Sequence, residues 1–294
     1  MGYLYLFCVA LMFSFGGTCV KLISPYFSAS FITFFRFFVG VMWLLLLKLT
    51  LRQHFRRDFK KALFTLGGWI LFGAAAKWMA YLTENYALSR GVSYGNIVTQ
   101  PAQTIFLTVT SVFLFKEKLP PRKIFCILLC ICGVLCISLN GRSLEVFFQE
   151  HVVLTGLFVL SGMCAGAHVL SQKMIADRMD IIDSNLSIFA VSALLSAIPL
   201  AGPVSTGALA GLRPDLPCIL AILAFGFITG MGFYLNARAI PLVPFYMVPV
   251  IQSTMAVFSI TWGVLFFHER ITPYIIGGTL MFMTGLIGLQ IKAR

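Results

Sequence analysis

The sequence is dominated by long apolar runs that are separated by short polar breaks. A helix that crosses the hydrocarbon core of a bilayer needs about 20 predominantly apolar residues. We therefore expect an all-α integral membrane protein with ten transmembrane helices. Only His268, Glu269 and Arg270 separate the last two runs. The runs are approximately 3–22, 28–49, 62–86, 92–115, 122–139, 151–172, 183–202, 216–237, 243–267 and 271–291.

The composition excludes a soluble protein. Hydrophobic residues make up 59% of the chain and charged residues 11%, whereas a soluble domain is about 25% charged. A soluble fold would have to expose the excess as apolar patches, which drive association. The 29 Phe, 9 Tyr and 4 Trp exclude a disordered chain as well, because they supply too much drive for burial.

The distribution of Lys and Arg predicts the orientation of the chain. If the N-terminus is cytoplasmic, fifteen of these residues, including Lys48, lie on the cytoplasmic side and five on the opposite side. Positive charge favours cytoplasmic loops, so we expect both termini in the cytoplasm and no nucleic-acid partner, despite the net charge of +12. The first run is long and has no basic leader, which predicts a first crossing rather than a signal peptide. Basic loops without long domains are typical of a bacterial inner-membrane protein.

The eight Cys residues all lie inside or beside apolar runs. Free Cys in such places usually acts as a small buried hydrophobe. Cys126 and Cys130 are one helical turn apart, so a soft metal between them is the alternative. We favour helix packing, and we expect neither a metal nor a cofactor.

The chain contains an internal repeat at an offset of 152 residues. The offset divides the chain into two predicted repeats, residues 1–142 and 143–294, with five crossings each. Because five is an odd number, the second copy must be inverted in the membrane. The matched pairs include Ala87 with Ala239, Tyr94 with Tyr246, Gln100 with Gln252, Phe106 with Phe258, Glu117 with Glu269, Pro121 with Pro273 and Gly133 with Gly285.

Charge around the repeated Glu agrees with this inversion. Four Lys and Arg residues surround Glu117 on the predicted inner face, whereas Glu269, on the predicted outer face, has only Arg270 and His268 beside it. The motif is kept while its positive charge is reduced on the side where positive charge is disfavoured. Inverted repeats are a transporter signature, because mirrored halves can open alternately around a site near the midplane.

Each repeat ends in an aromatic-rich helix, a Glu at the turn and a Gly-bearing final helix. In these features the chain resembles the ten-helix drug/metabolite transporter superfamily, EamA type. Pro101–Glu117, Pro249–Glu269 and Arg36 carry the resemblance, which covers essentially the whole chain. It implies a central cavity lined by helices one to four and six to nine, with five and ten peripheral. The second repeat departs from the first at Ile188, which stands opposite Arg36, and at Ser253, which stands opposite Pro101.

Arg36 and Lys77 are ionisable residues inside predicted spans, where charge is costly and usually faces the bundle interior. Both lie roughly 12–14 Å below the outer surface at a rise of 1.5 Å per residue. Lys77, Tyr81 and Glu84 share one helix face, with Trp78 beside it. The charges form either an internal ion pair or a site for a substrate carboxylate. We assign Arg36 to structure or gating, and the other four residues to substrate binding.

Amide side chains recur at helical spacing on the predicted fourth helix. Asn96, Gln100 and Gln103 share a face. Such a stripe either bonds a neighbouring helix or lines a polar cavity. Pro101 lies within the stripe and frees a backbone carbonyl, which favours the cavity. We assign the three amides to substrate binding and Pro101 to structure or gating.

The second repeat offers a comparable set. On the sixth helix, Ser161, His168 and Gln172 share a face, and His168 is either a packing residue or a proton carrier. Pro249 on the ninth helix is assigned to structure or gating. The substrate-binding candidates of this repeat are His168, Tyr234, Tyr246, Gln252 and Ser253.

Two further features concern the helix ends and the last helix. Glu117 and Glu269 stand at helix-end turns beside cations, so we expect them to fix turns or close gates. Glycines of the tenth helix permit close approach, for either a dimer contact or internal packing, so a monomer and a homodimer are both consistent with the sequence. These glycines are Gly277, Gly278, Gly285 and Gly288.

The leading function is a secondary transporter that exports a small organic metabolite, such as an amino acid or a related zwitterion or anion, by alternating access. A membrane enzyme would need a nucleophile, base or metal-ligand constellation. The four His are scattered and no span holds paired carboxylates, so we expect no enzyme. A lipid flippase or passive channel of the same fold is the alternative, although no selectivity-filter pattern occurs. The expected partners are a small metabolite and the bilayer.

Overall fold

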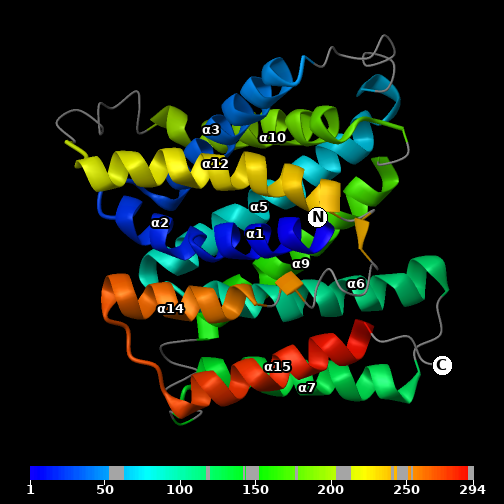
Figure 1. Ribbon diagram of the computed structural model, residues 1–294, viewed down its shortest axis with the longest axis vertical. Helices are drawn as coiled ribbons and strands as arrows, with labels where there is room; N and C mark the ends of the chain where they lie inside the picture. Colours follow the sequence, from blue (N-terminus) through cyan, green and yellow to red (C-terminus); the bar gives the residue numbers. More distant parts are fainter. Residues whose placement is uncertain are drawn as a thin grey trace.

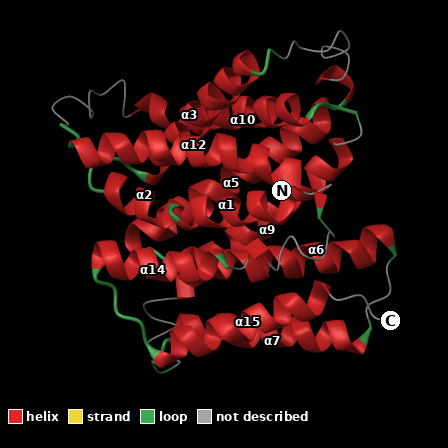
Figure 2. Cartoon of the chain, viewed as in Figure 1, coloured by secondary structure: helices red, strands yellow, loops and turns green. Residues whose placement is uncertain are grey.

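The computed structural model describes residues 1–52, 63–116, 120–141, 143, 152–175, 178–202, 213–239, 242–243, 251–252 and 254–290. Every regular element in this part of the chain is helical (Figure 2). Two are short 3₁₀ helices, η1 (Gly95–Val98) and η3 (Ile198–Leu200). The α-helices are α1 (Gly2–Ser14), α2 (Gly16–Ile23), α3 (Ala29–Thr50), α5 (Gly67–Arg90), α6 (Thr99–Phe115), α7 (Pro121–Leu139), α9 (Val152–Ile175), α10 (Ile181–Ala197), α12 (Leu216–Ala239), α14 (Met255–Phe267) and α15 (Pro273–Gln290).

These elements form the ten spans that the apolar runs predict. The first span consists of α1 and α2, which are separated at Phe15, and the fourth consists of η1 followed by α6. The seventh consists of α10 and η3. The third span was expected to end near residue 86 and continues to Arg90. In the ninth run, residues 244–250 and 253 lie outside the described residues.

Length and hydropathy separate the described spans into three groups. Six are long and apolar enough to cross a membrane on these grounds alone, and α14 and most of α15 are shorter apolar helices. The two that remain are α5 and the 17-residue α6. Both carry polar side chains in their middle turns, among them Lys77 and Glu84 on α5 and Gln103 on α6. The site they line, described below, accounts for this polarity.

The helices form a bundle with a clear centre and two edges (Figure 1). α7 and α15 pack against each other at one edge, and α3 and α10 lie at the opposite edge. α1, α5, α9 and α12 lie between these pairs. The fifth and tenth spans, α7 and α15, are therefore peripheral, as the resemblance implies.

Contacts between α7 and α15 show the inverted symmetry directly. A Cβ atom on Gly133 would lie 2.9 Å from the Cβ of Phe282, and one on Gly285 would lie 2.6 Å from the Sγ of Cys130. Cys130 and Phe282 are themselves 152 residues apart, as are Gly133 and Gly285. The two contacts are thus the same contact made in both directions, which a two-fold relation between the repeats requires.

The same glycines decide how the last helix packs. Gly278, Gly285 and Gly288 approach α7 so closely that added Cβ atoms would lie 2.4–2.8 Å from its atoms. Gly277 faces open space. Internal packing therefore accounts for three of the four glycines. Cys126 and Cys130 serve this packing, because each fills space against a glycine of α15.

The turns after the fourth helix of each repeat share an unusual backbone conformation. Lys116, directly after α6, has φ 53°, and His268, directly after α14, has φ 51°. A non-glycine residue with positive φ is uncommon. Its occurrence at two positions 152 residues apart indicates that both repeats end this helix in the same way.

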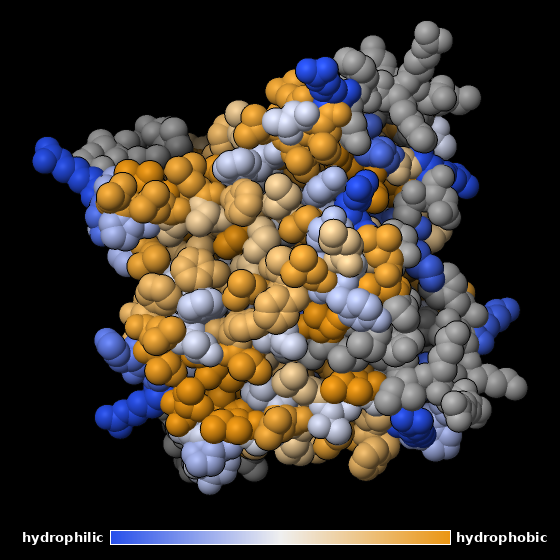
Figure 3. All heavy atoms as spheres, viewed as in Figure 1, coloured by the Kyte–Doolittle hydropathy of each residue, from blue (hydrophilic) through white to orange (hydrophobic). Residues whose placement is uncertain are grey.

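The surface has the pattern expected of a bilayer protein (Figure 3). Apolar side chains cover the middle of the visible face, and hydrophilic ones gather toward the ends of the helices. Large apolar side chains are outward-facing on several helices, for example Phe113, Leu128 and Leu265. In water such a surface would drive association, whereas lipid tails solvate it.

Candidate functional site

A cavity of about 120 Å³ lies in the middle of the bundle. It is lined by residues of spans one to four, six, eight and nine. The seventh span, α10, contributes no lining residue, contrary to what the resemblance implies, because it packs behind α3 and α5. The lining residues are Ala10, Phe13, Arg36, Lys77, Ala80, Tyr81, Glu84, Asn96, Thr99, Gln100, Gln103, Ser161, Ala165, His168, Val169, Gln172, Phe233, Asn236, Gln252 and Met255.

The spacing of polar residues predicts much of this wall. Lys77, Tyr81 and Glu84 all face the cavity from α5, as positions i, i+4 and i+7 require. The stripe of Asn96, Gln100 and Gln103 faces it too, and so does the sixth-span set of Ser161, His168 and Gln172. Asn96 belongs to η1 rather than to the α-helix that carries the two glutamines. The change of helix type does not remove it from the cavity.

Arg36 is buried and fully engaged. Its Nε donates to the Thr229 hydroxyl on α12 at 3.0 Å, and its Nη1 lies 3.6 Å from Glu84 Oε2 on α5. The guanidinium carbon lies 3.2 Å from the centroid of the Tyr81 ring and 4.1 Å from that of Phe225. Arg36 therefore links α3, α5 and α12, which supports the structural alternative for this residue.

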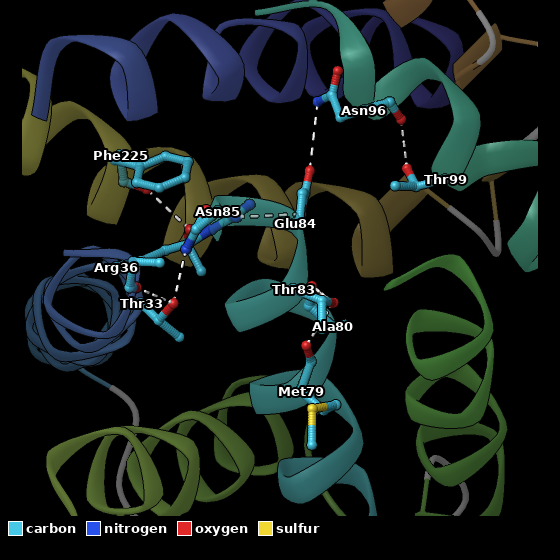
Figure 4. Close-up of polar contacts among 12 residues, drawn as sticks. Thr33, Arg36, Met79, Ala80, Thr83, Glu84, Asn85, Asn96, Thr99 and Phe225 are labelled. Carbon is cyan, nitrogen blue, oxygen red and sulfur yellow. Dashed lines mark hydrogen bonds and ion pairs between the residues drawn. The ribbon is translucent and has the colours of Figure 1, made fainter. Parts of the chain in front are cut away.

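Two residues of the first repeat contact the carboxylate of Glu84. Figure 4 shows Arg36 reaching toward it from α3 while Asn96 approaches the same carboxylate from η1. The Asn96 Nδ2 donates to Glu84 Oε1 at 3.5 Å. Next to this pair, the Asn85 side chain donates to the Thr33 hydroxyl at 2.9 Å and also joins α5 to α3. Glu84 thus pairs with Arg36 and makes no salt bridge to Lys77.

Lys77 is the cation without a carboxylate. Its side chain is 5% exposed, and its Nζ lies 4.1 Å from the centroid of the Tyr81 ring and 4.4 Å from that of Phe233. Among the described residues, no Asp or Glu pairs with it. Ring contacts offset only part of the cost of burying an ammonium group. A ligand carboxylate in the cavity would complete its pairing.

Two hydrogen-bond acceptors in the same wall are also unused. The buried Nε2 of His168 and Oδ1 of Asn96 have no partner in the described part of the chain. The Nδ1 of His168 lies 3.2 Å from the Gly73 carbonyl. Because a carbonyl can only accept, this contact places the hydrogen on Nδ1 and leaves Nε2 as an acceptor in the neutral ring. Buried polar atoms normally have partners, so both atoms are candidates for a ligand donor.

The amides with which the second repeat lines the cavity are already paired. Gln252 donates to Asn236 Oδ1 at 2.7 Å, and Gln172 donates to Asn185 Oδ1 at 2.8 Å. These bonds hold neighbouring spans together at the cavity wall. They leave fewer free groups for a ligand than Lys77, His168 and Asn96 do.

Several predicted site residues lie elsewhere. Trp78 and Tyr234 pack against the cluster around Phe37 and Phe189 and do not line the cavity. The reason is rotation about the helix axis: Trp78 follows Lys77 and points to the next face. Pro101 lies in the first turn of α6, where its missing N–H removes no bond from the helix interior. Glu117, Tyr246, Pro249 and Ser253 lie outside the described residues.

Glu269 joins the predicted outer ends of the two repeats. Its carboxylate oxygens accept hydrogen bonds from the Ser93 N–H and hydroxyl, both at 2.8 Å. Helix α2 also reaches this point, because a Cβ on Gly17 would lie 2.0 Å from the Ser93 carbonyl oxygen. The predicted outer ends of the first, third and ninth spans thus meet around Ser93. Of the two roles expected for Glu269, turn fixing and gate closing, this contact between the repeats favours gate closing.

At the predicted inner end, an ion pair appears that sequence analysis missed. Lys48 on α3 pairs with Asp183 on α10, and both side chains are buried. Lys48 was counted with the cytoplasmic loop, whereas it belongs to the last turn of α3. Asp180 precedes α10 and accepts from the Ile182 N–H as its N-cap. Two Asp residues three apart were a usable signal, because only one is needed to cap a helix.

Other missed residues are neutral and give little signal. Thr229 and Ser93 are single hydroxyls in apolar or loop sequence, and Phe225 and Phe233 are two of many aromatic residues. Their roles come from the cation or carboxylate that each contacts. No spacing rule would distinguish them before the fold is known.

The sequence profile of the EamA-like transporter family matches residues 1–139 and 154–290. The chain belongs to the EamA-like transporter family. A search of curated protein sequences returns no match. One solved structure, described as "Crystal structure of protein", is similar over 98% of this chain and 96% of its own, with 16% sequence identity and a TM-score of 0.67. That similarity supports the fold. The protein is accordingly a multi-pass membrane transporter of the EamA type.

Proposed function

We propose that this EamA-type protein is a secondary carrier for a small organic metabolite that bears a carboxylate, such as an amino acid or a related anion. The single observation that carries the proposal is Lys77, a buried cation at the wall of a central cavity that has no carboxylate partner among the described residues. Removing a charge from water is costly unless it is paired. The carboxylate of a ligand supplies the missing charge.

The rest of the wall supports this class of ligand. The acceptors His168 Nε2 and Asn96 Oδ1 suit a hydroxyl or amino group on the same molecule. Tyr81 and Phe233 provide an apolar surface beside Lys77. The volume of about 120 Å³ suits a molecule of a few carbon atoms and is small for a lipid, which disfavours the flippase alternative.

The proposed mode is alternating access in the inner membrane of a bacterium, with both termini in the cytoplasm and net export. The excess of Lys and Arg on one set of loops supports the orientation. Two inverted repeats around a midplane cavity support alternating access. When inside-out and right-side-out vesicles contain the same exchangeable carboxylate, faster uptake of labelled substrate into the inside-out vesicles is the expected result for export.

A ligand-stabilisation screen tests the binding site. Purified protein is heated with each of the amino acids and with small hydroxy and oxo acids, since a ligand that binds the folded state raises the unfolding temperature. Wild type and Lys123→Ala, which removes a lysine of α7 away from the cavity, are expected to show the same stabilising ligands. Lys77→Ala is expected to lose the shift. An equal shift in Lys77→Ala would place the binding site elsewhere.

A further inference from the structure

The charges that line the central cavity do not cancel. Arg36 and Lys77 contribute two positive charges and Glu84 contributes one negative charge. Glu84 is the partner of Arg36, so the excess resides at Lys77. Protonation of His168 would only add to it. While Lys77 holds its proton, the described wall of the empty cavity carries one uncompensated positive charge.

In the part of the chain that the structure describes, no other carboxylate is placed to compensate it. The described ones are engaged elsewhere: Asp183 with Lys48, and Glu269 with Ser93. Asp180 and Asp215 accept from backbone N–H groups at the starts of α10 and α12. The remaining carboxylates fall in sequence between the apolar runs: Asp58, Glu117, Glu145, Glu150 and Asp177.

In a carrier that works by alternating access, the uncompensated positive charge restricts which states can reorient. Between its two open states a carrier passes through a closed one in which the cavity is cut off from water. An unpaired charge in that state is strongly unfavourable, whereas a bound anion makes the sum of charges zero. The loaded carrier therefore changes state far more readily than the empty one.

We propose that the protein exchanges small monoanionic carboxylates one for one across the membrane, because the empty carrier does not reorient while Lys77 is protonated and has no carboxylate beside it. This inference rests on the proposed function and adds to it a counter-substrate and a charge. The carboxylate pairs with Lys77, and a hydroxyl on the same molecule donates to His168 Nε2 or Asn96 Oδ1. A monoanionic hydroxy acid satisfies all of these groups.

The requirement for a ligand with one net negative charge, called the charge rule below, distinguishes two molecules of nearly equal size. Lactate and alanine share the carboxylate and the methyl group, but alanine carries an ammonium group and has no net charge. Alanine pairs Lys77 and brings a new cation into a wall whose one carboxylate already faces Arg36. The cavity should therefore exchange lactate in preference to alanine.

The test uses the full-length protein in liposomes with labelled L-lactate outside. One set of vesicles contains unlabelled lactate and the other contains potassium sulfate, with valinomycin and potassium on both sides to suppress a membrane potential. We expect entry at least about tenfold faster into the lactate-loaded vesicles, as an electrostatic block on the empty carrier requires. We expect little exchange with labelled alanine.

The outcomes separate this inference from the proposed function. Equal entry of lactate into both sets of vesicles would overturn obligatory exchange and leave the carrier intact. Exchange of alanine at the rate of lactate would overturn the charge rule alone. Entry of neither molecule into any vesicle would overturn the carrier of small carboxylates as well.

A matched pair of variants tests the charge count itself. Gln100→Glu adds a fixed carboxylate to the cavity wall, and Gln100→Met removes the same amide without adding charge. We expect lactate exchange in the Glu variant to be lower by about tenfold or more relative to the Met variant. Equal exchange in the two variants would contradict the charge count, and the comparison of vesicle contents in wild type remains an independent test.

Discussion

The two repeats share a fold but contribute different chemistry to the cavity. The first repeat supplies Arg36, Lys77 and Glu84, which are the formal charges of the wall. The second repeat supplies the amides Gln172, Asn236 and Gln252, together with hydroxyl, imidazole and apolar groups. Ile188 stands at the position of the second repeat that corresponds to Arg36, and it is fully buried.

This difference shows that duplication of the helices does not require duplication of the site. The reciprocal packing of α7 and α15 preserves the symmetry where the repeats support each other. Toward the cavity, one half fixes the charge and the other presents a neutral wall. An asymmetric ligand, with a charged and an uncharged end, matches such a site better than a symmetric one.

The largest effect on stability is expected from Arg36→Leu. The change leaves Glu84 buried without its cation, and breaking a buried ion pair in this way costs about 3–5 kcal/mol. Unfolding of purified protein in mixed detergent should show this loss. Arg36→Leu combined with Glu84→Leu should recover much of it, because both charges are then absent. A double variant as unstable as the single one would show that Arg36 acts through its other contacts.

The sequence predicts the fold well because each part of the fold has a local cause. Apolar runs specify the helices, and the 152-residue offset specifies the inverted repeat. Of the charged cavity residues, Lys77 and Glu84 follow from periodicity on one helix. The partners of these charges could not be derived in the same way: Thr229 meets Arg36, and Asp183 meets Lys48, only after separate helices pack.

A second, smaller effect is expected from Glu269→Gln at the predicted outer end. Only one of the two terminal atoms of Gln can accept a hydrogen bond, so one of the two Ser93 donors loses its acceptor. A hydrogen bond to a charged group contributes about 1.5–3 kcal/mol. Hydrogen exchange in a peptide that covers residues 91–98 should become faster as the outer ends separate more often. Glu117→Gln, the corresponding change in the first repeat and on the predicted opposite side, should leave this peptide unchanged. Slower or unaltered exchange in Glu269→Gln would contradict a closing role.

In the neutral half of the cavity, Gln252→Met is expected to have a modest effect. It removes the 2.7 Å bond to Asn236, and a neutral hydrogen bond contributes about 1 kcal/mol to stability. The ligand-induced rise in unfolding temperature should remain, since the carboxylate is held by the first repeat. If Gln252→Met abolishes that rise as Lys77→Ala does, the claim that the first repeat alone holds the carboxylate is wrong.

The smallest cost in stability is expected from Lys77→Met. Methionine keeps much of the apolar stem and removes an unpaired buried charge, so the free energy of unfolding should stay within about 1 kcal/mol of wild type or increase. Binding of a carboxylate should nevertheless be lost. The contrast with Arg36→Leu separates the two cations: one stabilises the fold and the other binds the ligand. A strong destabilisation by Lys77→Met, comparable to that of Arg36→Leu, would remove the distinction.

The most direct measurement is a structure of the protein in complex with a carboxylate that stabilises it. The account predicts a carboxylate oxygen at about 2.7–3.2 Å from Lys77 Nζ, the range of a hydrogen bond, with Arg36 and Glu84 still paired. A ligand seated against Arg36 in place of Glu84, or bound outside the central cavity, would contradict it.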